Sequence, residues 1–155
     1  MLFRSKSLKK KIKEILKHGI RVKIIGDKRG LPSDIKKIVK IIEKKTIKNK
    51  KITLNLALNY GSKEEIINAF SKLISKKKSK ININTFEKEL YTSNIPDPEI
   101  LIRTGGTKRL SNFLLWQLAY TEIFFIDKLW PDFNENDYNK IINKFYKIKR
   151  NFGNI

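Results

Sequence analysis

The sequence lacks cysteine altogether and has one histidine and three alanines among its 155 residues. Without cysteine the chain forms no disulfide and no thiolate metal site, and a reducing, intracellular compartment is its natural setting. The longest apolar stretches, such as residues 112–120, are interrupted by polar groups and fall far short of the roughly 20 residues that a membrane span needs. The basic start, residues 1–17, lacks the continuous apolar core of a secretory signal. These absences predict a soluble cytoplasmic protein without structural zinc.

Positive charge is abundant and unevenly distributed. The 35 Lys+Arg and 15 Asp+Glu residues give a formal net charge of +20, and 29 of the basic residues are lysine. Residues 1–90 hold 26 basic and 8 acidic groups, a net +18, whereas residues 91–155 hold 9 and 7, a net +2. Ile, Lys and Asn fill 68 of the 155 positions, as expected of an AT-rich coding sequence, so mutational bias accounts for much of the charge. A basic surface of this kind can still contact anionic lipid peripherally.

The pattern of apolar residues predicts an α/β fold. A length of 155 residues with 40% apolar content suits a single domain, residues 1–155, with its own core. Short runs predict strands at residues 21–25, which are rich in β-branched side chains, at residues 52–58, expected to be buried, at the apolar residues 100–102, and at residues 123–126. Helical spacing predicts helices at residues 8–16, 35–42, 63–74, 111–120 and 135–150. Strands joined through helices pair in parallel, so we expect a parallel sheet of about four strands with flanking helices.

Local signals refine two helix starts and place polar residues after three strands. Ser62 can cap the third helix, with Glu65 completing a capping box, and the last helix is expected to begin near Asn134. The strands are followed by Gly26-Asp27, by residues 59–61 and by residues 103–106. Ligands of parallel α/β sheets bind beyond the carboxyl ends of strands, so these segments are the candidate binding loops.

The most informative loop is R-T-G-G-T-K-R-L-S, residues 103–111. It supplies Arg103 and Arg109, two glycines, and the Ser111 hydroxyl shortly before a predicted helix. Arginine's planar fork and a helix N-terminus both suit phosphate oxygens, so the segment fits a diphosphate. Arginines in glycine-containing turns are also commonly solvated, and the pattern alone leaves both interpretations open. The sequence contains no P-loop and no dinucleotide fingerprint.

Three segments then carry a family signature. Residues 100–138 read I-L-I-R-T-G-G-T-K-R-L-S-N-F-L-L-W-Q-L-A-Y-T-E-I-F-F-I-D-K-L-W-P-D-F-N-E-N-D-Y, residues 54–61 read L-N-L-A-L-N-Y-G, and residues 19–27 read G-I-R-V-K-I-I-G-D. With these segments the chain resembles the C-terminal portion of the cis-prenyltransferases, the undecaprenyl diphosphate synthases. The resemblance covers nearly the whole chain.

The resemblance implies an isoprenyl transferase. Such enzymes condense isopentenyl diphosphate with an allylic diphosphate such as farnesyl diphosphate, make cis-polyprenyl diphosphates, use Mg²⁺ and form homodimers. The family positions that hold isopentenyl diphosphate correspond to Arg103, Arg109, Leu110 and Ser111. The family's glutamate linked to the metal site, which reaches the partner subunit's site across the dimer, corresponds to Glu122.

The chain also departs from the family pattern. The family's D-G-N-G-R-W and F-S-x-E-N-W motifs, which bind magnesium and the allylic diphosphate and take part in condensation, are absent. Asn151 stands where the family often has the arginine of Arg-Phe-Gly. We therefore expect the C-terminal part of a cis-prenyltransferase domain, which retains the isopentenyl diphosphate half-site, exposes a sheet edge and is inactive alone.

Three hypotheses follow. The first is a shortened member of the cis-prenyltransferase family. The second is a noncatalytic subunit that completes a complex with a chain bearing the missing N-terminal half. The third is a basic nucleic-acid-binding protein, which the net charge invites. Against the third, the lysines follow the solvent faces of predicted helices and no interleaving of aromatic with basic residues occurs.

Overall fold

The structure is a computed structural model that describes residues 13–78 and 80–150. The chain divides into two compact units, a first unit of residues 1–92 and a second unit of residues 93–155. The helix expected at residues 8–16 lies largely outside the described residues, and residues 13–17 are helical. Of the helices in the described ranges, none has the length and apolar character needed to cross a membrane. That the whole chain acts as one domain stays a prediction.

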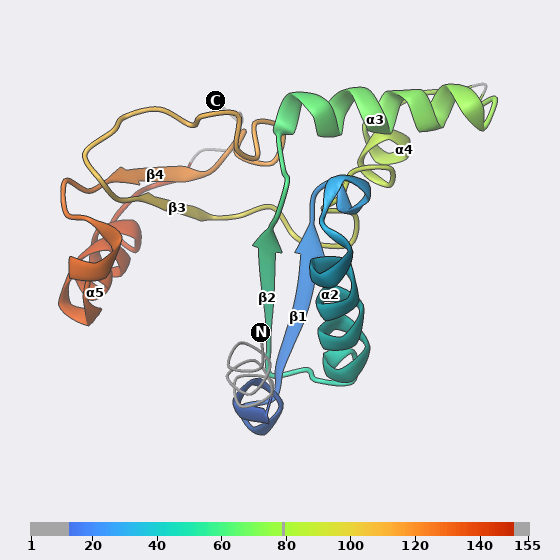
Figure 1. Cartoon of the computed structure of the whole chain (residues 1–155). Helices are drawn as coiled ribbons and strands as arrows, with labels where there is room; N and C mark the ends of the chain where they lie inside the picture. Colours follow the sequence, from blue (N-terminus) through green and yellow to red (C-terminus); the bar gives the residue numbers. More distant parts are fainter. Residues whose placement is uncertain (1–12, 79, 151–155) are drawn as a thin grey trace. The chain divides into compact units, whose positions relative to one another are not determined.

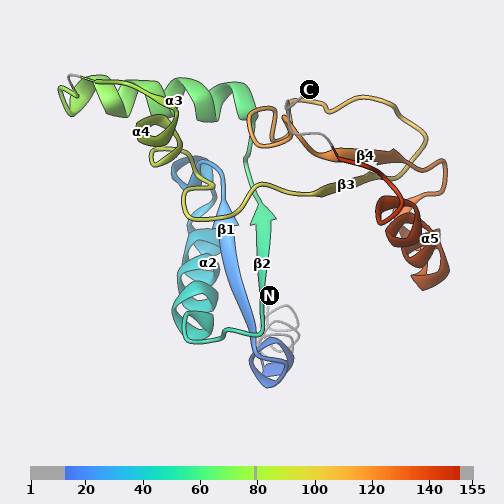
Figure 2. The same ribbon diagram turned by 180° about the vertical axis from the view of Figure 1, so that it is seen from behind.

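The first unit is built on two parallel strands. Strand β1 (Ile20–Ile25) pairs with β2 (Ile52–Ala57), and the helix between them is α2 (Ser33–Thr46). Helix α3 (Ser62–Ser75) follows β2, and a short helix, α4 (Ile83–Glu87), follows α3. Both views of the ribbon place β1 between β2 and α2 (Figures 1 and 2). The predicted strand–helix–strand unit with parallel pairing is therefore confirmed.

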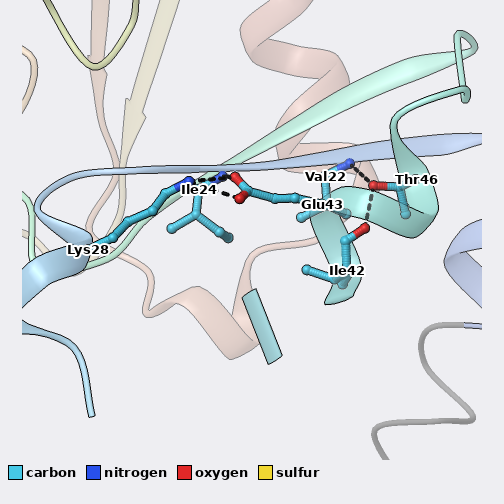
Figure 3. Close-up of polar contacts among 6 residues, drawn as sticks. All are labelled: Val22, Ile24, Lys28, Ile42, Glu43 and Thr46. Atoms are coloured by element: carbon cyan, nitrogen blue, oxygen red, sulfur yellow. Dashed lines mark hydrogen bonds and ion pairs between the residues drawn. The ribbon is translucent and has the colours of Figure 1, made fainter. Parts of the chain in front are cut away.

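Side chains of α2 accept hydrogen bonds from backbone amides of β1 (Figure 3). The Val22 amide donates to Thr46 Oγ1 at 3.0 Å, and the Ile24 amide donates to Glu43 Oε1 at 2.9 Å. Thr46, fully buried, in turn donates to the Ile42 carbonyl at 2.8 Å. Because a strand that pairs on one side leaves every second amide unpaired on the other, these bonds close the outer edge of β1. The α2 helix thus makes β1 an end strand.

The face of β2 has no comparable cover within the described residues. Ile52, Leu54 and Leu56 lie on one face of the strand and are 60%, 43% and 41% exposed. On the same face of β1, Val22 and Ile24 are buried against Val39 of α2. Helix α2 therefore covers the β1 half of this face and leaves the β2 half open within the described residues.

A second core in the first unit joins α3 to α4 and to the segment after α4. Ala69, Leu73, Phe86 and Leu90 form this cluster. Helix α4, which the sequence did not predict, begins with a capping box in which the Asn82 side chain accepts from the Thr85 amide and the Thr85 hydroxyl accepts from the Asn82 amide. Five residues give too short a periodic pattern to be recognised in advance.

Glu65 of α3 connects the segment before α3 with the segment after α4. Its side chain is 1% exposed, and its two carboxylate oxygens accept from the Tyr60 hydroxyl at 2.5 Å and from the Tyr91 amide at 2.7 Å. Helix α3 begins at Ser62, one residue before the predicted start, with Gly61 at the N-cap position. The sequence predicts a local capping role for Glu65, whereas in the structure its carboxylate accepts from nearby Tyr60 and from the distant Tyr91.

The second unit contains a second parallel pair. Strand β3 (Ile100–Arg103) pairs with β4 (Glu122–Phe125), with Ile100 opposite Glu122 and Arg103 opposite Phe125. Helix α5 (Glu135–Phe145) begins at the expected cap, since the Asn134 side chain accepts from the Asp137 amide at 3.2 Å. The four predicted strands and their parallel pairing are confirmed, as two pairs of strands.

The prediction of a helix at residues 111–120 is wrong. The structure has a series of turns there, and Ser111, Asn112 and Leu114 have φ values of +51°, +62° and +47°. Non-glycine residues with these dihedrals interrupt a right-handed helix, although the apolar spacing of the segment matches one. The last helix also ends at Phe145 rather than at residue 150.

The buried position of Glu65 generates a stability prediction. We expect Glu65→Ala to lower the free energy of unfolding by about 2 kcal/mol, because it leaves the Tyr60 hydroxyl and Tyr91 amide without their acceptor. The control is Asp34→Ala, which removes an exposed carboxylate from the first turn of α2 and costs a few tenths of a kcal/mol. Urea unfolding followed by circular dichroism measures both. Equal losses in the two variants would contradict the role assigned to Glu65.

Candidate functional site

The loop after β3 is tied by its backbone to the segment after β4. The Ile126 amide donates to the Arg103 carbonyl at 2.8 Å, the Gly105 amide to the Lys128 carbonyl at 2.8 Å, and the Gly106 amide to the Ile126 carbonyl at 3.1 Å. Gly105 and Gly106 have φ values of +90° and +70°, which glycine adopts without strain. The two glycines thus turn the chain sharply at the carboxyl end of β3.

Arg103 begins this loop and meets Ser111 at its far end. One guanidinium nitrogen, Nη1, donates to the Ser111 hydroxyl oxygen at 3.3 Å. The Arg103 Nε is buried and has no hydrogen-bond acceptor among the described residues. A buried donor without an acceptor is costly, and in native structures such a group often marks a functional site. The structure therefore brings together two of the predicted site residues with a donor still to be filled.

The other two predicted residues contribute less defined contacts. Arg109 is exposed, and within residues 13–78 and 80–150 no hydrogen bond or ion pair holds its guanidinium. Leu110 is half-buried, and its carbonyl accepts from the Phe113 amide at 3.1 Å. Since residues 111–120 are not helical, no helix N-terminus supports a phosphate here. The donors that this loop offers to an anion are the two guanidinium groups and the Ser111 hydroxyl.

Glu122 lies at the opposite end of the strand pair. It is opposite Ile100 in the parallel register, three residues before the Phe125 position that faces Arg103. Its Oε1 is 3.9 Å from Arg150 Nε, and its amide donates to the Glu99 carbonyl at 3.0 Å. Three residues of strand separate it from the Arg103 end by roughly 10 Å. Glu122 therefore does not share the loop site within one chain.

Arg150 is the residue that sequence reasoning missed. Its Nη1 pairs with Glu99 at 3.0 Å, its Nη2 donates to the Tyr120 carbonyl at 3.0 Å, and its guanidinium lies 5.4 Å from the Phe145 ring centroid. The guanidinium thus links the residue before β3, the segment before β4 and helix α5. The only signal in the sequence is that arginine is scarce, with six in the chain.

A metal centre is not assembled by the described residues. No group of three or more His, Cys, Asp or Glu side chains lies close enough among them to hold an ion. Glu122 already has the positive charge of Arg150 beside it. The donor set does not fit Mg²⁺, which takes oxygen ligands from carboxylates together with substrate phosphates.

Comparisons with known proteins identify the family of the chain. The prenyltransferase family model for undecaprenyl diphosphate synthases matches residues 1–153. An isoprenyl transferase of Prochlorococcus marinus is 47% identical over 97% of this chain and 57% of its own length. An isoprenyl transferase of Fusobacterium nucleatum is 42% identical over 97% of this chain and 65% of its own length. The chain therefore spans less than two thirds of these curated relatives.

Two solved structures share the fold. A probable undecaprenyl diphosphate synthase from Campylobacter jejuni gives a TM-score of 0.86 at 32% identity, over 98% of this chain and 72% of that one. A lavandulyl diphosphate synthase from Lavandula x intermedia, solved in complex with dimethylallyl diphosphate, gives a TM-score of 0.88 at 36% identity, over 95% of this chain and 66% of that one.

The contacts of Arg150 predict a structural role that can be measured. We expect Arg150→Ala to lower the free energy of unfolding by about 1–2 kcal/mol, because it removes a hydrogen bond to a carbonyl and the packing of the side chain on Phe145. The neighbouring Lys149→Ala removes the same charge from an exposed side chain and should change stability by less than about 0.5 kcal/mol. Thermal unfolding distinguishes them, and an Arg150→Ala protein as stable as Lys149→Ala would rule out the role.

Proposed function

The chain belongs to the undecaprenyl diphosphate synthase family of prenyltransferases, and from that premise we propose that it carries the isopentenyl diphosphate half-site of such an enzyme. The complete reaction joins isopentenyl diphosphate to an allylic diphosphate such as farnesyl diphosphate, with release of inorganic diphosphate, to give a cis-polyprenyl diphosphate. In this proposal the chain binds the isopentenyl substrate and does not complete the reaction alone.

The observation that carries the proposal is the pairing of Arg103 with Ser111 at the carboxyl end of β3. The Arg103 guanidinium extends one nitrogen to the hydroxyl and keeps the buried Nε without an acceptor. A diphosphate oxygen at this position would accept from Nε, and Arg109, which is exposed six residues further along, would neutralise a second oxygen. The role of these residues is to bind and orient the diphosphate, so that the carbon chain is held in a fixed direction.

The allylic half of the reaction requires groups beyond this loop. Ionisation of an allylic diphosphate places negative charge on the leaving group, and a metal ion commonly neutralises it. Membership of the family implies that the reaction uses Mg²⁺, but the donors among the described residues do not fit this ion. We propose that Glu122 contributes to a metal site only when a second subunit completes that site. The second subunit is either another copy of this chain or a chain that carries the absent motifs.

The alternative of a noncatalytic partner subunit is favoured by one observation, the open face of β2. The exposed side chains of Ile52, Leu54 and Leu56 form an apolar surface of the kind that another element covers. A chain that supplies the N-terminal portion of the fold would fit this need. Both versions of the proposal share the isopentenyl diphosphate half-site.

The half-site predicts weak binding of isopentenyl diphosphate. We expect Arg103→Ala to reduce the affinity at least tenfold, about 1.4 kcal/mol, because it removes a charge-assisted hydrogen bond to the diphosphate. Lys108→Ala is the matched control, since it removes one exposed positive charge from the same loop and should change the affinity by less than about threefold. Isothermal titration calorimetry gives the constants. Equal affinities of Arg103→Ala and the unaltered protein would refute the half-site.

The proposal that this chain carries only the isopentenyl diphosphate half-site predicts no product. The purified chain, supplied with farnesyl diphosphate, radiolabelled isopentenyl diphosphate and Mg²⁺, should form no extended polyprenyl diphosphate above the enzyme-free control. Extraction into butanol followed by thin-layer chromatography detects any product. Polyprenyl diphosphate formed by the chain alone would show that this half of the fold contains a complete active site.

A further inference from the structure

The first unit contains a cavity of about 690 Å³ at the carboxyl end of β1. Residues of three segments line it: those that follow β1, one face of α3, and Tyr91 beyond α4. Its volume falls in the range of pockets that hold small molecules, roughly 300–1,000 Å³. The cavity includes Gly26-Asp27, one of the polar segments after a strand that the proposed function does not use.

Hydrogen bonds join the loop after β1, which lines the cavity, to the loop after β2. Gly26 has a φ of +115°, and a Cβ there would lie 2.2 Å from the Leu58 carbonyl oxygen, so only glycine fits. The Asp27 amide donates to the Asn59 carbonyl at 3.1 Å, and the Asn59 side chain donates to the Asp27 carbonyl at 3.0 Å. The loop that presents Asp27 and the two cations after it is therefore fixed by the backbone.

The charges that line the cavity are unequal. Lys28, Arg29 and Lys72 are positive and Asp27 is negative, a net +2. Asp27 is occupied, because its two oxygens accept from Arg29 Nε at 2.9 Å and from Arg29 Nη2 at 3.1 Å. This pairing lowers the pKa of Asp27 and leaves Arg29 Nη1 outside the ion pair. Lys28 is paired with Glu43 at 2.7 Å.

Lys72 lies near the Glu89 carboxylate, which is hydrogen-bonded to Lys76, and its charge helps to lower the pKa of Glu89. Its ammonium donates to the Glu89 carbonyl at 3.1 Å and lies 5.6 Å from the Tyr91 ring centroid, and no ion pair joins it to a carboxylate among the described residues. The Tyr91 hydroxyl accepts from the Asn68 side chain at 3.1 Å. Burial, with the nearby Asp27 charge as a further cause, raises the pKa of Tyr91, so the phenol stays protonated at neutral pH and can donate.

We propose that this cavity binds the phosphate or diphosphate group of a small phosphorylated molecule. The Lys72 ammonium and the Tyr91 hydroxyl donate to its oxygens, and Arg29 Nη1 supplies a third donor at the entrance. The net positive lining disfavours a cation, and the carboxylate of Asp27 is already paired. The Tyr91 ring and Ile24 provide an apolar wall for the rest of the molecule. The site uses no residue of the Arg103 loop and is independent of the proposed function.

The test is a titration of the full chain with inorganic diphosphate, followed by NMR of the ¹⁵N-labelled amides. We expect saturable shifts at Asp27, Arg29 and Tyr91. Lys72→Gln should weaken the affinity derived from these shifts by roughly tenfold, while Lys72→Arg, which keeps the charge, should retain most of it. The double variant Arg103→Ala/Arg109→Ala should leave the shifts unchanged, which separates this site from the isopentenyl diphosphate half-site.

The control removes an equal charge elsewhere in the first unit. Lys37 is exposed on α2 and does not line the cavity. If Lys37→Gln weakens binding as much as Lys72→Gln, the effect is a general attraction of anions to a basic surface, and the proposal is overturned. Absence of shifts at these three amides, or shifts that disappear in the Arg103→Ala/Arg109→Ala variant, would overturn it as well.

Discussion

The parallel pairing of β3 with β4 determines which side chains of the second unit can act together. In this register Arg103 lies at the carboxyl end of the pair and Glu122 at the opposite end. The loop of residues 103–111 folds back so that Ser111 reaches Arg103, while Arg150 holds Glu122 near Glu99. One chain therefore presents the proposed diphosphate-binding loop at one end of the strand pair and the Glu122 carboxylate at the other, so the two do not meet within one chain.

In the first unit, β1 and β2 also pair in parallel, and α2 packs beside β1. The two strands therefore have different environments. Thr46 and Glu43 accept from amides of β1, so that edge is closed by side chains. Strand β2 pairs on one side only and leaves Ile52, Leu54 and Leu56 exposed. The chain also matches less than two thirds of the length of these curated relatives.

Short apolar runs predict the four strands, and Asn134 predicts the start of α5. The predicted burial of residues 52–58 is wrong, because most side chains of β2 are exposed within the described residues. Prediction from the sequence also fails at residues 111–120, where helical apolar spacing is overridden by left-handed dihedrals at Ser111, Asn112 and Leu114. The sequence predicts Arg103 and Ser111 as site residues, and the two meet because the loop of residues 103–111 folds back on itself. Arg150 could not be predicted, because its partners come from segments up to 51 residues away and no local pattern encodes that distance.

The most direct test of the central claim is a crystal structure of the chain grown with isopentenyl diphosphate. The claim is that one chain holds this substrate at the carboxyl end of β3 and nowhere near Glu122. We expect the diphosphate oxygens within hydrogen-bonding distance of Arg103 Nε and the Ser111 hydroxyl, with the Arg150 cluster unchanged. A diphosphate bound beside Glu122, or a loop of residues 103–111 without any bound diphosphate at saturating concentration, would contradict the account.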